Sequence, residues 1–341
     1  MSKPTVHDIA REAGVSLATV DRVLNARPGV AEKTICKVKA AVDRIGYVRD
    51  THAANLARNK QYRILVLLPK GVSQFVSSLR EALKEVAASS VAERVSLRIL
   101  EVPSQDPHAI IKELQALNVS KLDGIAIMAP ETPQIRDAIS HLKEEGLAVV
   151  ALVSDLPNSQ RDYFIGIDNV AAGRTAGFLM GKFLNTAGEI LVVTNSLRSR
   201  DSLERRLGFD SVMTSDFPTF TSLPTVESYD DRGRIIDAIS RIITERPDIV
   251  GVYSMGAGNA AVLDGLRQTV RDDGLVVIMH ELTPIARQGL MNGEVTAVIS
   301  QHVGHLVRSA VRVLRSICDQ IDIYEAQERI RIDVIVRENL P

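Results

Sequence analysis

The stretch TVHDIAREAGVSLATVDRVLN, residues 5–25, decides the fold of the first part of the chain. Thr5 followed by Asp8 is typical of a helix start. Gly14 can adopt the positive φ of a tight turn, and Ser16 is a favourable N-cap for a second helix. Apolar residues repeat at helical spacing on both sides of the turn. The pattern predicts two short helices that pack across a tight turn, a helix-turn-helix.

The residues that follow predict a third helix and then a linker. Ile35, Val38, Val42 and Ile45 recur every three to four residues, and Gly46 ends the pattern. Residues 47–61 are mostly polar with a short Ala/Leu patch, and a helix this short is only marginally stable alone in water. We expect an all-α domain over 1–46 and a hinge or linker over 47–61.

From Arg63 onward the pattern changes to short β-rich runs that alternate with amphipathic helical stretches. Repeated β-α-β units with continuously apolar strands predict a doubly wound parallel sheet with helices on both faces. So many strands over about 280 residues predict two such lobes, which together form a core over 62–341. The expected strands are 64–68, 95–100, 124–128, 148–153, 189–193, 249–254, 275–279 and 297–300.

Charge is distributed unevenly along a chain whose net charge is close to zero. The 341 residues are 45% hydrophobic and carry a formal net charge of −1. Residues 1–60 contain 11 Lys or Arg against 6 Asp or Glu, a net charge of +5, so the remainder carries −6. A basic head on an acidic body is typical of a chain that meets a polyanion with one end.

Several other classes of protein are disfavoured. The sequence has neither an apolar run as long as a membrane span nor the apolar core of a signal peptide, so we expect a cytoplasmic protein. Cys36 and Cys318 are far apart and lie in no CxxC pattern, which argues against a disulfide scaffold and a zinc site. We expect no metal and no cofactor.

The start of the second helix is suited to reading DNA. Leu17, Ala18 and Arg22 should be exposed there and could meet base edges in the major groove. Arg22 is suited to a bidentate contact with guanine, whereas Leu17 and Ala18 could only offer apolar contact, for instance to thymine methyl groups. The alternative is an ordinary three-helix bundle with a solvated basic face.

A longer match favours the DNA-reading interpretation. The segments DIAREAGVSLATVDRVLN (8–25), LNARPGVAEKT (24–34), RIGY (44–47) and AANLA (53–57) closely resemble the DNA-binding head and hinge of the LacI/GalR family of bacterial transcription regulators. Ala31 departs from the family pattern, because a Ser or Thr cap is common there.

The resemblance implies roles for individual residues. Leu17, Ala18 and Arg22 match the base-reading positions. A hinge helix is implied as well, in which Leu56 would act as a wedge in a minor-groove step and kink the DNA. The positions that match phosphate contacts are Thr5, Ser16, Thr19, Asn25 and Tyr47, and the hinge positions are Ala53, Leu56 and Ala57.

For the core, the resemblance implies the periplasmic-binding-protein fold, in which the chain crosses between lobes three times. We expect an N-lobe over about 62–160 and 293–321 and a C-lobe over about 163–291 and 322–341. Ligands of open α/β sheets lie at the carboxyl ends of the strands. The cleft between the lobes should therefore bind a small effector.

Candidate effector-binding residues follow from the same resemblance. Ser154 and Asp155 come directly after a strand, IDNVAAGR (167–174) resembles the family stretch DNxxAGR, and SRDSLERRLGF (199–209) places Arg205 where an arginine usually holds the effector. For each residue the alternative is a helix cap or a solvated loop. The full set of candidates is Phe75, Ser154, Asp155, Arg205, Asn259, Glu281 and Gln301.

Two segments depart from the family pattern, and one of them suggests an alternative function. Gly256-Ala257 replaces the usual Asn-Asp, and Met279-His280-Glu281 replaces the usual Gly-Phe-Asp, so the effector should be unusual for the family. The run GAGNAA (256–261) also satisfies G-x-G-x-x-G/A, and Glu281 follows Gly258 by 23 residues. An NAD-binding dehydrogenase is therefore the alternative, although the run lies late in the chain.

The resemblance favours a regulator over an enzyme. We expect a homodimeric repressor of carbohydrate uptake or catabolism genes that binds a pseudopalindromic operator and is released by a sugar, a polyol or a sugar derivative. The segment IRIDVIVRENLP (330–341) has no leucine heptad, which favours a dimer over a tetramer. A transport receptor of the same fold is disfavoured by the DNA-reading head.

Overall fold

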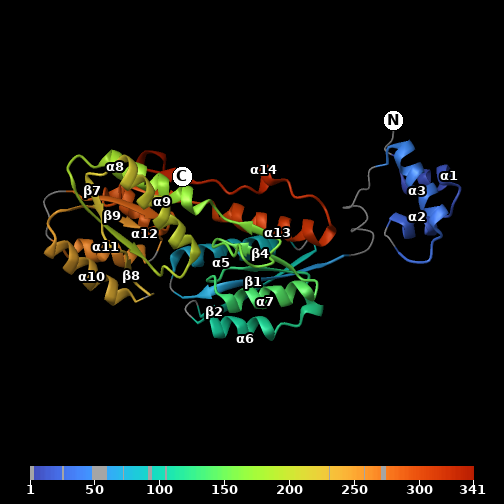
Figure 1. Cartoon of the computed structure of the whole chain (residues 1–341), viewed down its shortest axis with the longest axis horizontal. Helices are drawn as coiled ribbons and strands as arrows, with labels where there is room; N and C mark the ends of the chain where they lie inside the picture. Colours follow the sequence, from blue (N-terminus) through green and yellow to red (C-terminus); the bar gives the residue numbers. More distant parts are fainter. Residues whose placement is uncertain are drawn as a thin grey trace. The chain divides into compact units, whose positions relative to one another are not determined.

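The structure is a computed structural model that describes residues 4–24, 27–47, 60–71, 73–90, 94–103, 106–229, 231–256, 258–269 and 274–341. The chain divides into two compact units, the head (residues 1–60) and the core (residues 61–341) (Figure 1).

The described part of the head is helical, as the sequence predicts. It contains α1 (Val6–Ala13), α2 (Leu17–Leu24) and α3 (Glu32–Ile45). Gly14 ends α1 with φ 64° and Gly46 ends α3 with φ 64°, the left-handed conformation that glycine adopts without steric cost. The helices pack around a small core whose fully buried members are Ile9, Val20, Val38 and Ala41.

The first lobe of the core is an all-parallel sheet with the strand order β2-β1-β3-β4-β5. Its strands β3 and β4 are buried along their whole length because helices cover both faces. Helices α6 and α7 lie on one face, and α5 and α13 on the other (Figure 1). The elements are β1 (Tyr62–Lys70), α5 (Gln74–Ser89), β2 (Val95–Pro103), α6 (Pro107–Gln115), η1 (Val119–Lys121), β3 (Gly124–Ile127), α7 (Pro133–Glu144), β4 (Ala148–Leu152), β5 (Tyr163–Ile165) and α13 (Val303–Asp319).

The second lobe has the strand order β12-β11-β10-β9-β6-β7, and β8 pairs with β6. Its strands run parallel except for β12, which pairs antiparallel with β11. One face packs on α10, α11 and α12 through the apolar cluster that includes Ile239 and Val262. The elements are α8 (Asn169–Phe183), β6 (Gly188–Thr194), α9 (Arg200–Asp216), β7 (Phe220–Ser222), β8 (Val226–Glu227), α10 (Arg232–Glu245), β9 (Ile249–Ser254), α11 (Asn259–Arg267), β10 (Val276–His280), α12 (Pro284–Asn292), β11 (Ala297–Ser300), β12 (Asp333–Ile335) and η2 (Arg337–Asn339).

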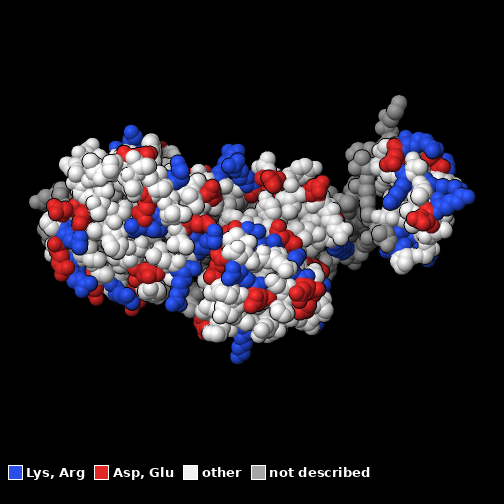
Figure 2. Space-filling model, in the orientation of Figure 1, with Lys and Arg blue, Asp and Glu red and all other residues white. Residues whose placement is uncertain are grey.

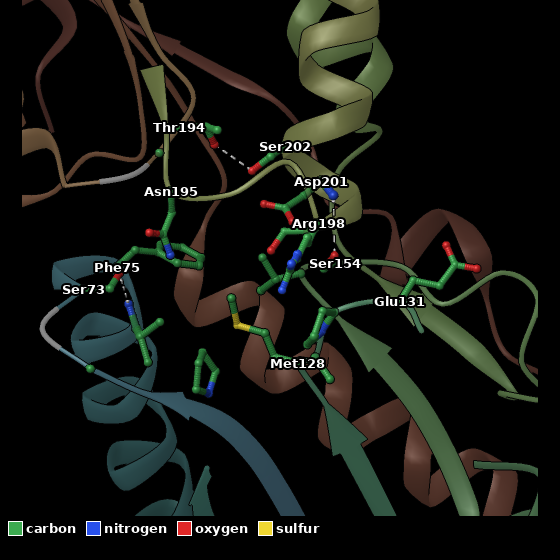
Figure 3. A pocket seen from close by; sticks show the side chains of 18 of the residues that line it. Ser73, Phe75, Met128, Glu131, Ser154, Thr194, Asn195, Arg198, Asp201 and Ser202 are labelled. Atoms are coloured by element: carbon green, nitrogen blue, oxygen red, sulfur yellow. Dashed lines mark hydrogen bonds between the residues drawn. The ribbon is translucent and has the colours of Figure 1, made fainter. Parts of the chain in front are cut away.

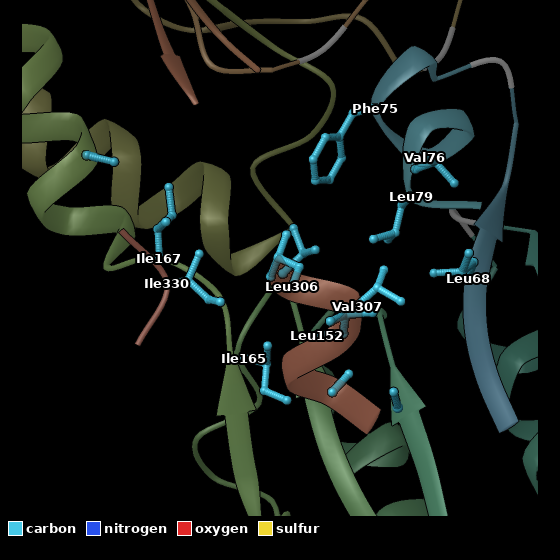
Figure 4. Close-up of a cluster of buried hydrophobic side chains, with 14 of the residues drawn as sticks. Leu68, Phe75, Val76, Leu79, Leu152, Ile165, Ile167, Leu306, Val307 and Ile330 are labelled. Carbon is cyan, nitrogen blue, oxygen red and sulfur yellow. The ribbon is translucent and has the colours of Figure 1, made fainter. Parts of the chain in front are cut away.

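A single apolar cluster continues from one lobe into the other. Phe75 and Leu79 of α5 lie close to Leu306 of α13, and Ile167 and Ile330, which lie where the chain passes between the lobes, belong to the same cluster (Figure 4). The shared cluster holds the carboxyl ends of the two sheets close together.

The lobe boundaries differ from the sequence-based expectation. Strand β5 belongs to the first sheet, although we expected the second lobe to begin at 163, and β11 belongs to the second sheet, although we expected 293–321 in the first lobe. Helix α14 (Glu325–Glu328) contacts α13, because Glu328 accepts a hydrogen bond from Ser309 Oγ at 2.5 Å. The segment after 321 therefore joins the second lobe only at β12. The apolar pattern of a short strand does not reveal which sheet it joins.

Two further expectations concern membranes and cysteine. Within the described ranges, no helix is long and apolar enough to span a bilayer. Cys36 and Cys318 are free thiols, and Cys318 Sγ donates a hydrogen bond to the carbonyl of Asp123 at 3.3 Å.

Candidate functional site

The exposed surface of α2 carries the residues that the sequence assigns to base reading. Leu17 is 42% exposed, and Ala18 and Arg22 are exposed as well. Neither a hydrogen bond nor an ion pair occupies the Arg22 side chain within the described part of the head. The neighbouring Asp21 instead pairs with Arg27, with 3.3 Å between Asp21 Oδ2 and Arg27 Nη1. The Arg22 guanidinium thus keeps its donors available for a ligand.

The residues proposed to hold phosphates are partly engaged within the head. Thr5 donates to the Asp8 carboxylate from its backbone nitrogen and its hydroxyl, at 2.9 and 2.8 Å. Ser16 Oγ caps α2 by accepting from Thr19 N at 3.2 Å, and it lies 2.9 Å from Thr19 Oγ1. Tyr47 is half-buried against the head core. Thr5, Ser16 and Thr19 therefore form hydrogen bonds at the first turn of α1 or α2, where the backbone N–H groups have no partner within the helix.

Some of the residues that the sequence analysis assigns to DNA binding are not described by the structure. Asn25 and the hinge residues Ala53, Leu56 and Ala57 lie outside the described residues. Ala31 is the N-cap of α3 and provides no side-chain hydrogen bond, as its departure from the family pattern predicts. More basic than acidic side chains appear on the face of the head that Figure 2 shows.

The core contains a cavity of about 450 Å³ between its lobes. This volume lies within the range of roughly 300–1,000 Å³ that is typical of sites for small molecules. The wall is formed where strands end and helices begin, with Phe75 and Ser154 from one lobe and Asn195 and Asp201 from the other (Figure 3). This is the edge at which open α/β sheets bind ligands.

Arg205 forms the floor of the cavity and is only 2% exposed. Its Nε donates to Asn169 Oδ1 at 2.9 Å, and its Nη1 donates to the carbonyl of Met255 at 2.9 Å. Its guanidinium also lies 3.6 Å from Glu281 Oε1 and 4.0 Å from Asp201 Oδ2. These contacts fix the guanidinium, so it can orient a ligand without losing side-chain entropy on binding.

Close packing of two helices places Arg205. A Cβ atom added at Gly173 of α8 would lie 2.0 Å from the carbonyl oxygen of Arg205, and one added at Gly208 of α9 would lie 2.1 Å from that of Val170. The helices therefore approach at a distance that only glycine permits. Both glycines belong to the segments, IDNVAAGR and SRDSLERRLGF, that the sequence analysis singled out.

Glu281 is a buried carboxyl group in the same wall. Gln301 Nε2 donates to Glu281 Oε1 at 2.8 Å, whereas Glu281 Oε2 has no hydrogen-bond partner among the described residues. Burial raises the pKa of Glu281 to about 7, although Arg205 and Gln301 favour the charged form. At neutral pH this group can both accept and donate a hydrogen bond, which suits a ligand hydroxyl group.

Two residues of the wall have strained backbones. Val153 has φ 67° and directly follows β4, and Glu281 has φ 69° and directly follows β10. A positive φ is rare for any residue with a side chain and is an outlier for a β-branched one. Such strain gathers at binding and catalytic sites, because the surrounding fold must enforce it. The two strained positions support the assignment of the cavity as a functional site.

Three candidate residues lie outside the cavity wall. The Asp155 carboxylate binds the Arg161 guanidinium, with 2.7 Å between Asp155 Oδ2 and Arg161 Nη2. Asn259 accepts from Ser254 Oγ and donates to the carbonyl of His280, both at 2.8 Å, so it links β9 to β10. Gln301 is joined to the wall by the hydrogen bond that its Nε2 donates to Glu281 Oε1. The sequence alone does not show which of these polar side chains form hydrogen bonds within the protein and which face the cavity.

The structure adds wall residues that the sequence analysis did not name. Asn195 directly follows β6, and Arg198 and Asp201 lie near the start of α9. Lys70 ends β1, and Glu131 follows β3 and binds Arg200 Nη1 at 2.9 Å. All of them lie at the end of a strand, just after one, or near a helix start, so the rule that was applied to Ser154 could have found them.

Comparisons with known proteins agree with this geometry. The family model described as "Periplasmic binding protein domain" matches residues 64–321, and the model "Bacterial regulatory proteins, lacI family" matches residues 5–50. The structure of a glucose-galactose binding protein from Geobacillus stearothermophilus covers 83% of this chain and 99% of its own, with a TM-score of 0.73 and 20% identity. At that identity the likeness shows the fold alone.

Curated relatives point to the same family. Catabolite control protein A of Streptococcus mutans is 30% identical over 52% of this chain and 51% of its own length. The ribose operon repressor of Escherichia coli is 30% identical over 38% of each chain. The chain spans about half the length, or less, of these curated relatives.

The comparisons also bear on the alternative of a dehydrogenase. Gly256 lines the cavity beside Arg205, and Gly258 is the N-cap of α11 with φ 57°. The two relatives are named as a catabolite control protein and an operon repressor, not as enzymes, and this agrees with the expectation of a non-enzymatic chain. With a helix-turn-helix head at residues 5–50 and a two-lobed α/β core that matches over 64–321, the chain belongs to the lacI family of bacterial regulatory proteins that carry a periplasmic-binding-protein domain.

Proposed function

We propose that the protein is a sequence-specific DNA-binding transcription regulator, a repressor of carbohydrate uptake or catabolism genes that a small sugar-like effector releases. The observation that carries the proposal is the outer surface of α2, where Leu17, Ala18 and Arg22 are exposed and no described residue of the head occupies the donors of Arg22. A recognition helix in the major groove reads bases with such residues.

The charge of the head supports DNA as its partner. Residues 1–60 carry a net charge of +5, and the rest of the chain carries −6. Phosphate contacts position a protein on DNA, whereas base contacts specify the sequence. The half-buried or capping hydroxyls of Thr5, Ser16 and Thr19 lie at helix starts, where phosphate groups bind favourably.

The effector would bind in the cavity between the lobes of the core and control operator affinity from there. Arg205 and Glu281 would bind its hydroxyl groups, and Phe75 would provide an apolar surface for its ring. In a homodimer, effector binding would shift the first lobes of the two subunits relative to each other. This shift would separate the two hinges and weaken the binding of a pseudopalindromic operator. A coupling free energy of about 1–3 kcal/mol is typical of such linkage.

A mobility-shift titration with the DNA upstream of the protein's own gene tests the DNA-binding proposal. We expect tight binding that weakens steeply as salt rises, because phosphate contacts release counterions. Arg22→Ala should cost about 1–3 kcal/mol of operator binding. Lys39→Ala, which removes an exposed charge from α3, is the matched control. If the protein does not bind this DNA at low salt, the proposal that it is a transcription regulator is wrong.

The hinge assignment has its own test. Replacing Leu56 with Ala should lower operator affinity, because the side chain is proposed to open a minor-groove step, while the melting temperature of the core stays the same. An affinity equal to that of the unmodified protein would rule out the wedge role and leave the rest of the proposal intact.

A further inference from the structure

The rim of the cavity carries two cationic side chains, Lys70 and Arg198, that form neither a hydrogen bond nor an ion pair with the described residues. Lys70 is the last residue of β1, and Arg198 lies in the loop between β6 and α9, so they come from different lobes. Both line the cavity and both are exposed. Within the described residues, the side chain of neither one forms a hydrogen bond or an ion pair. Arg198 appears among the residues around the cavity in Figure 3.

The other charges in the wall have partners. Glu131 accepts from Arg200 Nη1 at 2.9 Å. Arg205 lies between the carboxylates of Glu281 and Asp201, at 3.6 and 4.0 Å. Lys70 and Arg198 are therefore the charged side chains of the wall without a partner among the described residues, and they lie at the rim, not on the floor.

Glu227 is the acidic residue whose pKa responds to Arg198. Its pKa is lowered although burial acts in the opposite direction, because it accepts hydrogen bonds and because Arg198 is near. Its carboxylate oxygens already accept from Leu197 N and from the Tyr229 hydroxyl, both at 2.7 Å. Glu227 thus lies near Arg198, but no hydrogen bond or ion pair joins the two side chains within the described residues.

Helix starts add to the positive potential at this end of the cavity. Helices α5 and α9 both begin in the wall, where Ser73 and Ser199 are their N-caps. The first turn of a helix carries a partial positive charge and favours an anion. This contribution reinforces the two side-chain cations, which are the main observation.

The floor of the cavity has a different chemistry. Glu281 is only 4% exposed, and its Oε2 atom has no partner among the described residues. A buried polar atom normally has a hydrogen-bond partner, so this oxygen points to a ligand group such as a hydroxyl. The floor of the cavity thus favours a hydroxyl group of the ligand, and the rim favours an anionic group.

We propose that the effector is a small polyhydroxy compound that carries a phosphate or carboxylate group, with the anionic group bound by Lys70 and Arg198 and the hydroxyl groups bound near Glu281. This inference rests on the proposed role of the cavity as the effector site. Charge-assisted hydrogen bonds from an arginine and a lysine are suited to both kinds of oxyanion.

Calorimetric titration of the full chain with matched pairs of compounds tests the inference. The probes are D-glucose with glucose 6-phosphate and gluconate, D-ribose with ribose 5-phosphate and ribonate, and inorganic phosphate alone. We expect at least one anionic compound to bind ten times or more tightly than its neutral parent, and its affinity to fall as salt rises. The phosphate and carboxylate arms show which oxyanion the rim prefers.

Variants of the rim make the test specific. Lys70→Met and Arg198→Met remove a charge but keep most of the apolar stem, and each should weaken the anionic compound about tenfold while the neutral parent is unaffected. Lys112→Met and Arg241→Met remove exposed charges outside the cavity wall and are the matched controls. Melting temperatures check that every variant is folded.

The outcomes separate this inference from the proposed function. If neutral sugars bind as tightly as their anionic partners, or if both rim variants leave the ratio of affinities unchanged, the anionic effector is wrong and a sugar-sensing site remains. If none of the probes binds, both the anionic effector and the sugar-like effector fail. Operator binding is measured without any of these compounds, so its result stands in every case.

Discussion

At the scale of a single residue, Glu281 combines burial, backbone strain and an unusual acidity. It is 4% exposed, has φ 69° and lies 3.6 Å from the Arg205 guanidinium. Desolvation raises its pKa to about 7, and the nearby Asp201 acts in the same direction. The sequence identified Glu281 as a candidate from a family position, but only the structure shows that this carboxyl group titrates near neutral pH.

The acidity of Glu281 predicts a pH-dependent stability. A folded-state pKa above the unfolded value means that its contribution is fully present below pH 4.5 and is lost as pH rises through about 7. Glu281→Gln stays neutral, so relative to the unmodified protein it should gain up to about 3 kcal/mol of unfolding free energy between pH 5 and pH 8.5. Denaturant titrations at both pH values measure this difference.

The exposed Glu85 of α5 provides the control for Glu281. Glu85→Gln makes the same chemical change at an exposed position, so it shows how much of the effect of Glu281→Gln is due to burial. If Glu281→Gln and Glu85→Gln change the stability in the same way at both pH values, the carboxyl group of Glu281 is not desolvated in solution.

At the scale of the element, the pair α8 and α9 controls the geometry of the site. Both helices contribute to the floor, since Asn169 begins α8 and Arg205 lies in the second turn of α9. The hydrogen bond between Asn169 and Arg205 requires the close approach that Gly173 and Gly208 allow. A larger residue at either glycine would move the guanidinium away from the cavity.

Gly173→Ala should therefore destabilise the core, by roughly 1–3 kcal/mol if the helices can shift, because the new methyl group would meet backbone atoms. Gly233→Ala is the matched control. It lies on the exposed surface in the first turn of α10, where a Cβ atom would lie 3.6 Å from Asp231 Oδ1, so it should not destabilise the core. Equal melting temperatures for the two variants would contradict the packing argument.

At the scale of the whole molecule, the chain is made of two units of different size and chemistry. The head has a small apolar core around Ile9, Val20 and Val38, whereas the core unit contains continuous buried sheets. A domain of about 60 residues buries a smaller fraction of its surface than a larger one and is correspondingly less stable. The basic charge lies on the smaller unit.

This difference in size predicts a difference in hydrogen exchange. Amide protons of Ile9, Val20 and Val38 should exchange faster than those of Leu65 and Ile125, because local unfolding of the small unit costs less free energy. Addition of operator DNA should slow exchange in the head, since a ligand stabilises the form that it binds. Equal protection of the two units in the free protein would show that they unfold together.

The sequence by itself determined the local structure of this protein and the kind of family to which it belongs. Gly14, Gly46 and the capping of Ser16 placed the helices of the head, because these signals act within a few residues of the chain. The longer strands from β1 to β11 were predicted as well, since buried parallel strands are continuously apolar. The short strands β5, β7, β8 and β12 contain too few residues to show such a pattern.

The tertiary structure alone decided which polar side chains face the cavity and where the chain crosses between the lobes. Asp155 follows a strand as Ser154 does, yet Arg161 binds its carboxylate. Lys70 and Arg198 line the cavity and have no partner in the part of the chain that the structure describes. Arg205 and Glu281 are far apart in the sequence, and the packing of helices such as α8 and α9 determines that their charged groups lie side by side in the wall. Sequence patterns record local preference, but a binding site depends on these long-range contacts.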